Sequence, residues 1–207
     1  VYGHDADGVR IEHNLFASEG HGVYFRKITS RKGGAAHIVA TGNLFAGARL
    51  TAACLPADNP PFVVGNHLDA NVYPANGSKL FALTSWATRT GRMDRRILER
   101  ALKPLGPDAA SLPPFGEPED DPPGRFLNLD QWRTVTGFDE HSVVAPIQYA
   151  LDRNTWTLVL TIPENALLTR PAKETASGTD FFGVPWGTNT QAGPFANLKP
   201  GRQIIQL

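Results

Sequence analysis

The tetrapeptide Asn-Leu-Phe-Ala occurs twice near the N-terminus, beginning at Asn14 and again at Asn43. Each copy follows a short strand-like run, and a related pattern, Val-Val-Gly-Asn, begins at Val63. The two full copies are 29 residues apart, and further asparagines follow at Asn66 and Asn71. Such a repeat, with loops of variable length, is typical of solenoids, in which stacked coils bury apolar residues that one coil cannot bury alone.

The repeat predicts parallel strands in stacked coils between Val9 and Tyr73, with Asn14 and Asn43 at equivalent corners. Adjacent strands would lie about 4.8 Å apart. We expect asparagine at these corners because it tolerates the left-handed backbone conformation and because stacked side-chain amides can hydrogen-bond to one another. The competing interpretation is an ordinary β-sandwich in which the tetrapeptide recurs by chance.

The sequence pattern divides the chain into three parts. Residues 1–86 are predicted to form the parallel coils. Residues 87–124 are predicted to be an insertion outside the stack, with a helix from Met93 to Lys103 and then a loop rich in Pro, Gly and acidic residues. Residues 125–207 are predicted to form a last coil and an irregular cap, with a helical turn at 129–132 and a strand from Trp156 to Ile162.

Composition excludes several classes of partner. Lys plus Arg and Asp plus Glu number 20 each, so the formal net charge is zero. A nucleic-acid-binding protein usually carries a basic excess or stripe, so we expect no nucleic-acid partner. No apolar run reaches the roughly 18 residues of a membrane span, so we expect no membrane partner. The 20 glycines and 17 prolines indicate many turns.

Cysteine and histidine usage argues against a metal site. Cys54 is the only cysteine, which excludes an intramolecular disulfide and a cysteine cluster, and we interpret it as a core residue. His-Glu-x-x-His is absent. The chain opens on Val1 without a visible signal peptide, and we expect it to be a piece of a longer chain with an upstream part.

Four further motifs carry a family resemblance: Asn71-Val-Tyr73, the Trp-containing segment 129–132, Gly137-Phe-Asp-Glu-His-Ser142, and Asp180-Phe-Phe-Gly-Val-Pro185. Together they resemble the C-terminal portion of bacterial right-handed parallel β-helix proteins of the pectate-lyase-like superfamily. The resemblance implies an all-β fold, a right-handed parallel β-helix of a few coils truncated at its N-terminus. A helical insertion and an irregular C-terminal cap would complete it.

The same resemblance implies carbohydrate chemistry and an extracellular or periplasmic location. The leading hypothesis is a polysaccharide-degrading enzyme, a glycoside hydrolase with paired carboxylates and no cofactor, acting on a polysaccharide or oligosaccharide. One alternative is a polysaccharide lyase, for which calcium would be the cofactor. The other is a non-catalytic segment, for glycan binding or structure, whose catalytic part lies upstream. Fold alone does not decide among these.

The richest polar cluster lies at the N-terminus and supplies the candidate catalytic residues. Glycoside hydrolysis uses two carboxylates, one as acid and one as base or nucleophile. We predict Asp7 as base or nucleophile and Glu19 as proton donor, with Asp5 as a further carboxylate. The alternative is that Asp5 and Asp7, beside Gly8, only close a turn.

Substrate-binding roles are predicted for His21, Arg26 and Glu12. His21 lies between two glycines, where a ligand can approach the backbone; Glu12 could instead belong to a solvated strand face. Asp139 and His141 have the spacing of a dyad, but we interpret them as a structural tie in which His141 bonds to backbone. No metal ligands are predicted.

Overall fold

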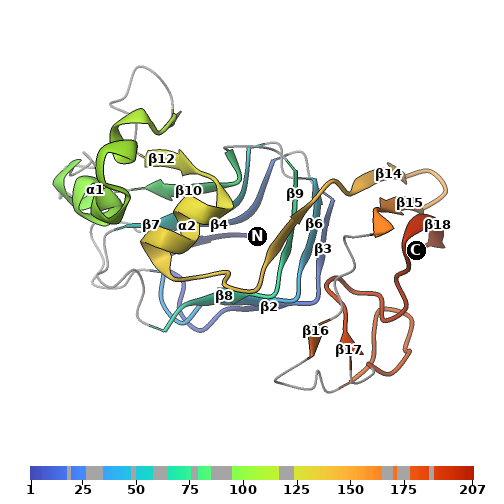
Figure 1. The fold of residues 1–207 in the computed structure, drawn as a ribbon. Helices are drawn as coiled ribbons and strands as arrows, with labels where there is room; N and C mark the ends of the chain where they lie inside the picture. The colour runs from blue at the N-terminus through green and yellow to red at the C-terminus, as the bar shows by residue number, and fades with distance from the viewer. Residues whose placement is uncertain are drawn as a thin grey trace.

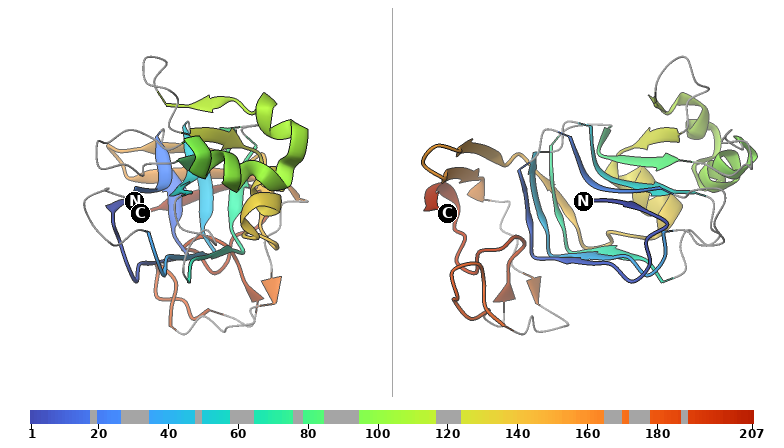
Figure 2. Two further views of the ribbon diagram at one scale, coloured as in Figure 1. Left: turned by 90° about the vertical axis from the view of Figure 1, so that its left-hand side faces the viewer. Right: turned by 180° about the vertical axis from the view of Figure 1, so that it is seen from behind.

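The computed structural model describes residues 1–17, 20–26, 35–47, 50–57, 65–75, 79–84, 95–116, 124–164, 170–171, 178–186 and 189–207. Short strands follow one another along the first part of the chain and are collected into three sheets (Figure 1). The C-terminal region lies on the side of the molecule opposite the helix of residues 95–102 (Figure 2). Within the described ranges, no helix is long and apolar enough to span a membrane.

From β1 to β10, each sheet takes every third strand. Sheet I holds β1 (Tyr2–His4), β4 (His21–Arg26), β7 (Thr51–Pro56), β10 (Phe81–Thr84), β12 (Gly124–Leu127) and β11 (Pro114–Phe115). Sheet II holds β2 (Arg10–Glu12), β5 (Val39–Thr41) and β8 (His67–Asp69). Sheet III holds β3 (Leu15–Ala17), β6 (Leu44–Gly47), β9 (Val72–Pro74) and β13 (Val143–Ala145).

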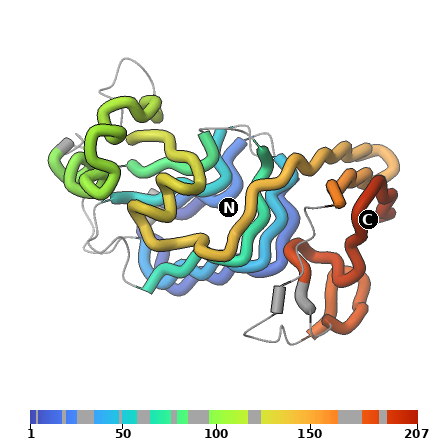
Figure 3. Tube along the Cα trace, viewed as in Figure 1, coloured from blue at the N-terminus to red at the C-terminus, as the bar shows by residue number. Residues whose placement is uncertain are grey.

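The predicted parallel pairing between Val9 and Tyr73 is confirmed. In sheet II, Arg10 is paired with Val39 and Val39 with His67, all in parallel. In sheet III, the two copies of the tetrapeptide align, with Leu15 opposite Leu44. The trace shows successive turns of chain lying one behind the other (Figure 3).

Asparagine side chains join the turns at the corner between sheets II and III. The Asn43 side-chain oxygen accepts the backbone N–H of Asn14 at 3.0 Å and its side-chain amide at 3.2 Å. Asn71 accepts the same two bonds from Asn43, both at 3.0 Å. Asn14 and Asn43 therefore occupy equivalent corners, as predicted. The ladder stabilises the corners because each buried amide satisfies backbone groups of its neighbour.

The left-handed conformation at these corners belongs to the residue before each asparagine. His13, Gly42 and Ala70 have φ of 52°, 65° and 59°. Our expectation that asparagine itself takes this conformation is wrong, because the asparagine side chain is needed for the ladder. At Gly42 a side chain would also collide with the His13 ring, 2.8 Å from the position of an added Cβ.

The space between the three sheets is filled by apolar side chains, including a line of stacked or edge-packed rings. Neighbouring ring centroids along this line are 4.4, 5.0, 4.9 and 4.8 Å apart. In order, the rings belong to Phe16, Phe45, Tyr73, Phe81 and Trp132. Each copy of the tetrapeptide thus supplies one phenylalanine ring, and the two rings stack on each other in the core.

The predicted fold class, an all-β right-handed parallel β-helix, is wrong for this molecule. Sheet I is mixed, because β10 pairs in parallel with β7 but antiparallel with β12, and the C-terminal sheets are antiparallel. No sheet of the described residues closes on itself or continues as a solenoid, and helices pack into the core. The molecule is a mixed α and β structure with mostly parallel sheets. The repeat misled the prediction because it covers only the first part of the chain.

The helix predicted within the insertion is confirmed where the structure describes it, as α1 (Arg95–Leu102); Met93 and Asp94 lie outside the described residues. A 3-10 helix, η2 (Lys103–Ser111), follows it. The helix lies beside the sheets (Figure 2), but Leu98 and Leu102 are buried in the main core. The segment is therefore part of the domain core and not an appendage.

The helical turn predicted at 129–132 is a full helix, α2 (Leu129–Thr136), which begins with a capping box between Asn128 and Gln131. Gly137 ends it in the left-handed conformation, with φ of 71°. Trp132 on this helix is completely buried. The helix thus covers the end of the space enclosed by the three sheets, where Trp132 stacks on Phe81.

The C-terminal region is built mainly of antiparallel strands. β14 (Gln148–Asp152), β15 (Thr157–Ile162) and β18 (Gly201–Gln206) form one sheet, and β16 (Arg170–Pro171) pairs with β17 (Asn189–Thr190). The strand predicted from Trp156 to Ile162 is confirmed from Thr157 onward. Its Leu158 and Leu160 share a second core cluster with Leu44 of sheet III, which attaches this region to the parallel sheets.

Candidate functional site

The outer surface of sheet II carries a regular set of polar side chains. On each of its strands the central residue, Ile11, Ala40 or Leu68, is buried in the main core. Side chains alternate along a strand, so the flanking residues point outward. We call this outward surface the polar face; it is formed by Arg10, Glu12, Val39, Thr41, His67 and Asp69.

Three of these residues form a row across the strands. Strand register places Thr41 opposite both Glu12 and Asp69. Adjacent members of the row are therefore one strand spacing, about 4.8 Å, apart at the backbone. The Thr41 hydroxyl donates to Glu12 Oε1 at 3.4 Å. Arg10 donates to both carboxylate oxygens of Glu12, at 2.6 and 3.1 Å, and so orients that carboxylate.

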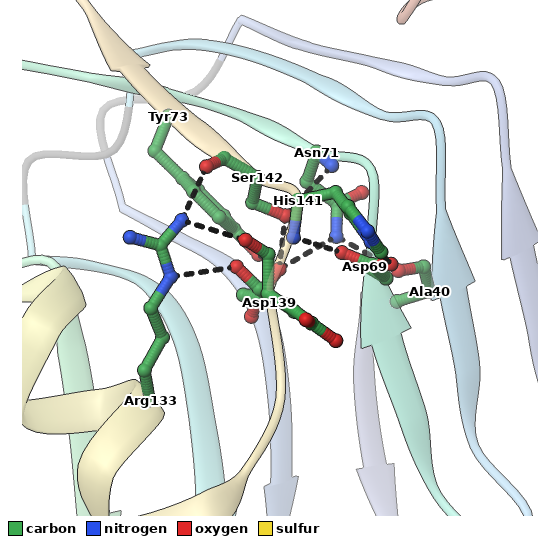
Figure 4. Close-up of polar contacts among 9 residues, drawn as sticks. Ala40, Asp69, Asn71, Tyr73, Arg133, Asp139, His141 and Ser142 are labelled. Carbon is green, nitrogen blue, oxygen red and sulfur yellow. Dashed lines mark hydrogen bonds and ion pairs between the residues drawn. The ribbon is translucent and has the colours of Figure 1, made fainter. Parts of the chain in front are cut away.

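His141 extends the row beyond the third strand. Its Nδ1 lies 2.7 Å from Asp69 Oδ2, and its backbone N–H donates to Asp69 Oδ1 at 2.8 Å. The His141 side chain is 63% exposed, whereas that of Asp69 is 16% exposed. Figure 4 shows this pair at the edge of a larger polar cluster. The histidine ring is thus held at the surface by a largely covered carboxylate.

The electrostatics of the pair favour an ionised Asp69. Burial by itself raises the pKa of Asp69, but hydrogen bonds from the His141 ring and from the backbone of His141 and Ala70 outweigh burial, and the pKa is lowered. An ionised carboxylate only accepts hydrogen bonds, so Nδ1 of His141 is the donor. When the ring is neutral, its Nε2 is then the nitrogen available to accept a proton.

A buried aspartate holds the loop that positions His141. Asp139 Oδ1 accepts hydrogen bonds from Ser142 Oγ at 2.5 Å, the Tyr73 hydroxyl at 2.9 Å and the Asn71 amide at 3.2 Å. Its Oδ2 accepts from the Trp132 indole at 2.9 Å. Burial raises the pKa of Asp139, and these hydrogen bonds act against that rise. Asp139 also continues the asparagine ladder, since it takes the amide of Asn71.

Arg133 fixes the same loop from the other side. It donates to the backbone oxygens of Asp139 at 2.8 Å, Glu140 at 3.3 Å and Ser142 at 2.6 Å (Figure 4). Our interpretation of Asp139 and His141 is therefore partly wrong. The motif is structural at Asp139, but the His141 ring pairs with the side chain of Asp69 rather than with backbone.

The structure does not gather the N-terminal cluster into one site. Arg26 on β4 is paired with His4, which directly precedes Asp5, whereas His21 lies at the other end of the same strand. Five residue steps along a strand span about 17 Å, so His21 is remote from Asp5 and Asp7. His21 is thus not a neighbour of Asp5 and Asp7. Glu19 and the side chain of Arg26 lie outside the described residues, so the roles given to this cluster stay predictions.

Each predicted residue has a definite environment where it is described. Asp7 lies 2.7 Å from the His37 ring in an exposed pair. Asp5 has φ of 44° in the turn that leads to β2, which favours the turn interpretation. His21 Nδ1 lies 2.8 Å from the Thr51 hydroxyl, and its ring stacks on Tyr24. Glu19 and the side chain of Arg26 lie outside the described residues.

Glu12 is the one predicted residue that belongs to the polar face. Sequence reasoning missed Thr41, Asp69 and the pairing of Asp69 with His141. The signal was present in the repeat, because Glu12, Thr41 and Asp69 each lie two residues before a ladder asparagine. Residues at one repeat position stack on the same face of a sheet, so aligning the repeat would have revealed this row.

Comparison with known proteins adds no relative. No family model matches the chain, and neither the curated proteins nor the solved structures contain a match. In the described part of the chain, no cluster of three or more His, Cys, Asp or Glu residues is placed to hold a metal ion. The function is therefore argued from the chemistry of the polar face.

Proposed function

We propose that the polar face binds a polysaccharide or oligosaccharide. The observation that carries this proposal is the row Glu12–Thr41–Asp69, continued by His141. It offers hydrogen-bonding groups at intervals of about 4.8 Å across a flat sheet, a spacing on the scale of one sugar unit. Carboxylates accept hydrogen bonds from sugar hydroxyls, and the threonine hydroxyl can both donate and accept.

The charges of the face suit a ligand rich in hydroxyls. Arg10 lies on the same surface as Glu12 and Asp69, so the face carries charges of both signs. Arg10 is engaged with Glu12, which keeps that carboxylate in place before a ligand arrives. A polysaccharide ligand is consistent with a location outside the cell or in the periplasm, which we propose with it.

One observation favours a second candidate function, hydrolysis of the bound glycan. Glu12 and Asp69 point outward from strands two spacings apart, about 9.6 Å at the backbone. Inverting glycosidases hold their two carboxyl groups about 6.5–9.5 Å apart, which leaves room for the attacking water. Asp69, with its lowered pKa, would serve as the base, and Glu12 would serve as the proton donor once the ligand displaces Arg10 and Glu12 takes up a proton.

Binding is tested by titrating a panel of soluble polysaccharides against the protein in affinity electrophoresis and calorimetry. We expect Glu12→Gln and Thr41→Val each to weaken binding about tenfold, as the loss of one or two hydrogen bonds predicts. Glu164→Gln is the matched control, because Glu164 is exposed and lies outside the polar face. Equal affinities for the wild type and both face variants would refute the proposal.

Hydrolysis is tested separately on whichever polysaccharide binds. Reducing ends should appear with the wild type, and the anomer released first should be inverted. Asp69→Asn should abolish this release even at glycan concentrations that saturate the variant. Binding without any release of reducing ends would reject hydrolysis and leave the binding proposal intact.

A further inference from the structure

Three exposed histidines lie on or beside the polar face: His37, His67 and His141. His67 is one of the residues that form the face. The His37 ring lies over Gly65, two residues before His67, where a side chain on residue 65 would otherwise be. The His141 ring continues the row Glu12–Thr41–Asp69 through its contact with Asp69. We call the three histidines the histidine set.

Two members of the histidine set are held in place by carboxylates. His37 Nδ1 lies 2.7 Å from Asp7 Oδ1, and His141 Nδ1 lies 2.7 Å from Asp69 Oδ2. While such a ring is neutral, its Nδ1–H donates to the carboxylate and the pair carries one negative charge. When the ring takes up a proton on Nε2, the pair becomes neutral overall and gains a second N–H donor on an exposed ring.

The charged side chains around the histidine set are mostly acidic. In the described part of the chain, the polar face and its rim carry three carboxylates and one guanidinium: Asp7, Glu12, Asp69 and Arg10. His67 shares β8 with Asp69 and lies in the row that begins at Arg10. The loop before β13 adds Glu140 and Arg133, one charge of each sign. Carboxylates therefore outnumber cations while the histidines are neutral, and protonation of the set reverses this balance.

We propose that the polar face is controlled by pH: it binds an acidic polysaccharide when the histidine set is protonated and rejects it when the set is neutral. This inference rests on the proposed glycan-binding function and adds the class of glycan and the control of its binding. The row Glu12–Thr41–Asp69 positions the sugar units, and the protonated rings donate to their carboxylate or sulfate groups. The change falls between about pH 7.5 and 5.5, where histidine gains its charge.

The geometry prepares His141 for this role before a ligand arrives. Its backbone N–H donates to Asp69 Oδ1 at 2.8 Å, and Arg133 donates to three carbonyl oxygens of the same loop. A ring that is already held loses little conformational entropy on binding. A lysine in this position would attract anions at every physiological pH, whereas a histidine makes the attraction depend on pH.

The test uses polymers with one shared backbone: dextran, carboxymethyl-dextran and dextran sulfate. Their acidic groups stay ionised at both about pH 7.5 and about pH 5.5, so only the protein changes its charge. At constant ionic strength, calorimetry should show at least one acidic polymer binding about tenfold more tightly at the lower pH. The polymer that responds identifies carboxylate or sulfate as the group bound, and circular dichroism at each pH checks that the protein stays folded.

Proton linkage gives a second readout, which a purely structural role of the histidines would not produce. Because the acidic ligand favours protonated rings, its binding near about pH 6.5 must draw protons from solution. Calorimetry in two buffers of different ionisation enthalpy measures this uptake. The triple variant with His37→Gln, His67→Gln and His141→Gln should lose both the uptake and the pH dependence of binding. Proton uptake that persists in this variant would overturn the proposal.

A charge substitution locates the effect on the polar face. At about pH 7.5, His67→Lys should bind the acidic polymer several-fold more tightly than the wild type, because lysine is charged there. Asn154→Lys adds the same charge at an exposed turn of the C-terminal sheet and should not change binding. Equal gains in the two variants would show that only the net charge of the protein matters, against the proposal.

The outcomes separate this inference from the proposed function. If a neutral glycan binds equally at both pH values and neither acidic polymer responds to pH, the inference is rejected and the proposed function stands. Absence of binding by every polysaccharide at both pH values rejects both. A single-stranded oligonucleotide that binds more tightly than the acidic dextrans at the lower pH would assign the face to nucleic acid and overturn the proposal.

Discussion

At the residue scale, the carboxylate of Asp139 is the centre of a buried hydrogen-bond network. Four side chains donate to its carboxylate, and they come from the ladder corner at Asn71, from sheet III, from α2 and from its own loop. Such a network is stable only when complete, because each donor is buried with it. The exposed His141 is therefore positioned by a residue that no solvent or ligand contacts.

Asp139→Ala should lower the free energy of unfolding by about 3–5 kcal/mol, because it leaves several buried donors without an acceptor. Urea denaturation followed by circular dichroism measures this loss. Asp130→Ala is the matched control, since the Asp130 side chain is 91% exposed on the same helix-and-loop segment. We expect that control to stay within about 0.5 kcal/mol of the wild type. Similar losses in the two variants would contradict the role given to Asp139.

At the element scale, α1 shows that an insertion in sequence can be part of the core in space. Leu98, Ala101 and Leu102 lie on one side of the helix and are buried with residues of sheet I. Helices of this length gain most of their stability from such packing rather than from propensity. The helix of the predicted insertion therefore contributes to the domain core.

Leu98→Ala should destabilise the whole domain by about 2–4 kcal/mol, the usual cost of removing a buried leucine side chain. The measurement is the urea midpoint of the strand signal in circular dichroism, not the helix signal alone. Glu99→Ala, the exposed neighbour on the same helix, should have little effect. If Leu98→Ala melts only the helix and leaves the sheets at their original midpoint, α1 is an appendage after all.

At the scale of the whole molecule, the C-terminal region is attached to the parallel sheets at one corner. The backbone N–H of Gly193 donates to Gly42 at 2.7 Å. The His13 ring stacks on Trp186 with centroids 4.7 Å apart, and its Nδ1 lies 3.3 Å from the Gln191 carbonyl oxygen. The C-terminal region thus meets the first two ladder corners, at His13 and Gly42, and the His13–Gln191 contact joins residues 178 positions apart.

This attachment should make stability depend on pH. Burial lowers the pKa of His13, against the opposite effects of the Gln191 carbonyl and Glu12. The unfolded chain therefore binds a proton more readily than the folded one, and stability falls as pH drops below the ordinary histidine pKa of about 6.5. His13→Gln should reduce the loss of urea midpoint between about pH 7 and pH 5.

His67→Gln provides the control for this pH experiment, because His67 is exposed on the polar face. The loss of stability should shrink in His13→Gln without vanishing, since burial also lowers the pKa of His21. If the pH dependence of stability is the same in His13→Gln as in the wild type, the contact of His13 with the C-terminal region does not contribute to it.

The sequence by itself determined the features that depend on local pattern. The repeated Asn-Leu-Phe-Ala predicted the parallel pairing and the equivalent corners, because residues at one repeat position take the same place in each turn. Helix-forming residues predicted α1, a helical turn was predicted at the start of what is α2, and strand-forming residues predicted β15. The sequence analysis also predicted Glu12 as a substrate-binding residue, but it did not predict the row that Glu12 forms with Thr41 and Asp69.

Only the tertiary structure decided the fold class and the site. The antiparallel pairing of β12 with β10 and the burial of α1 depend on the path of the chain after Thr84. The repeat in the sequence does not predict that path. The pairing of Asp69 with His141 joins residues 72 positions apart. The sequence around either residue does not predict this contact, because it forms only when the Asp139 loop packs across the end of the sheets. Long-range contacts of this kind arise from packing, which a periodic sequence pattern does not specify.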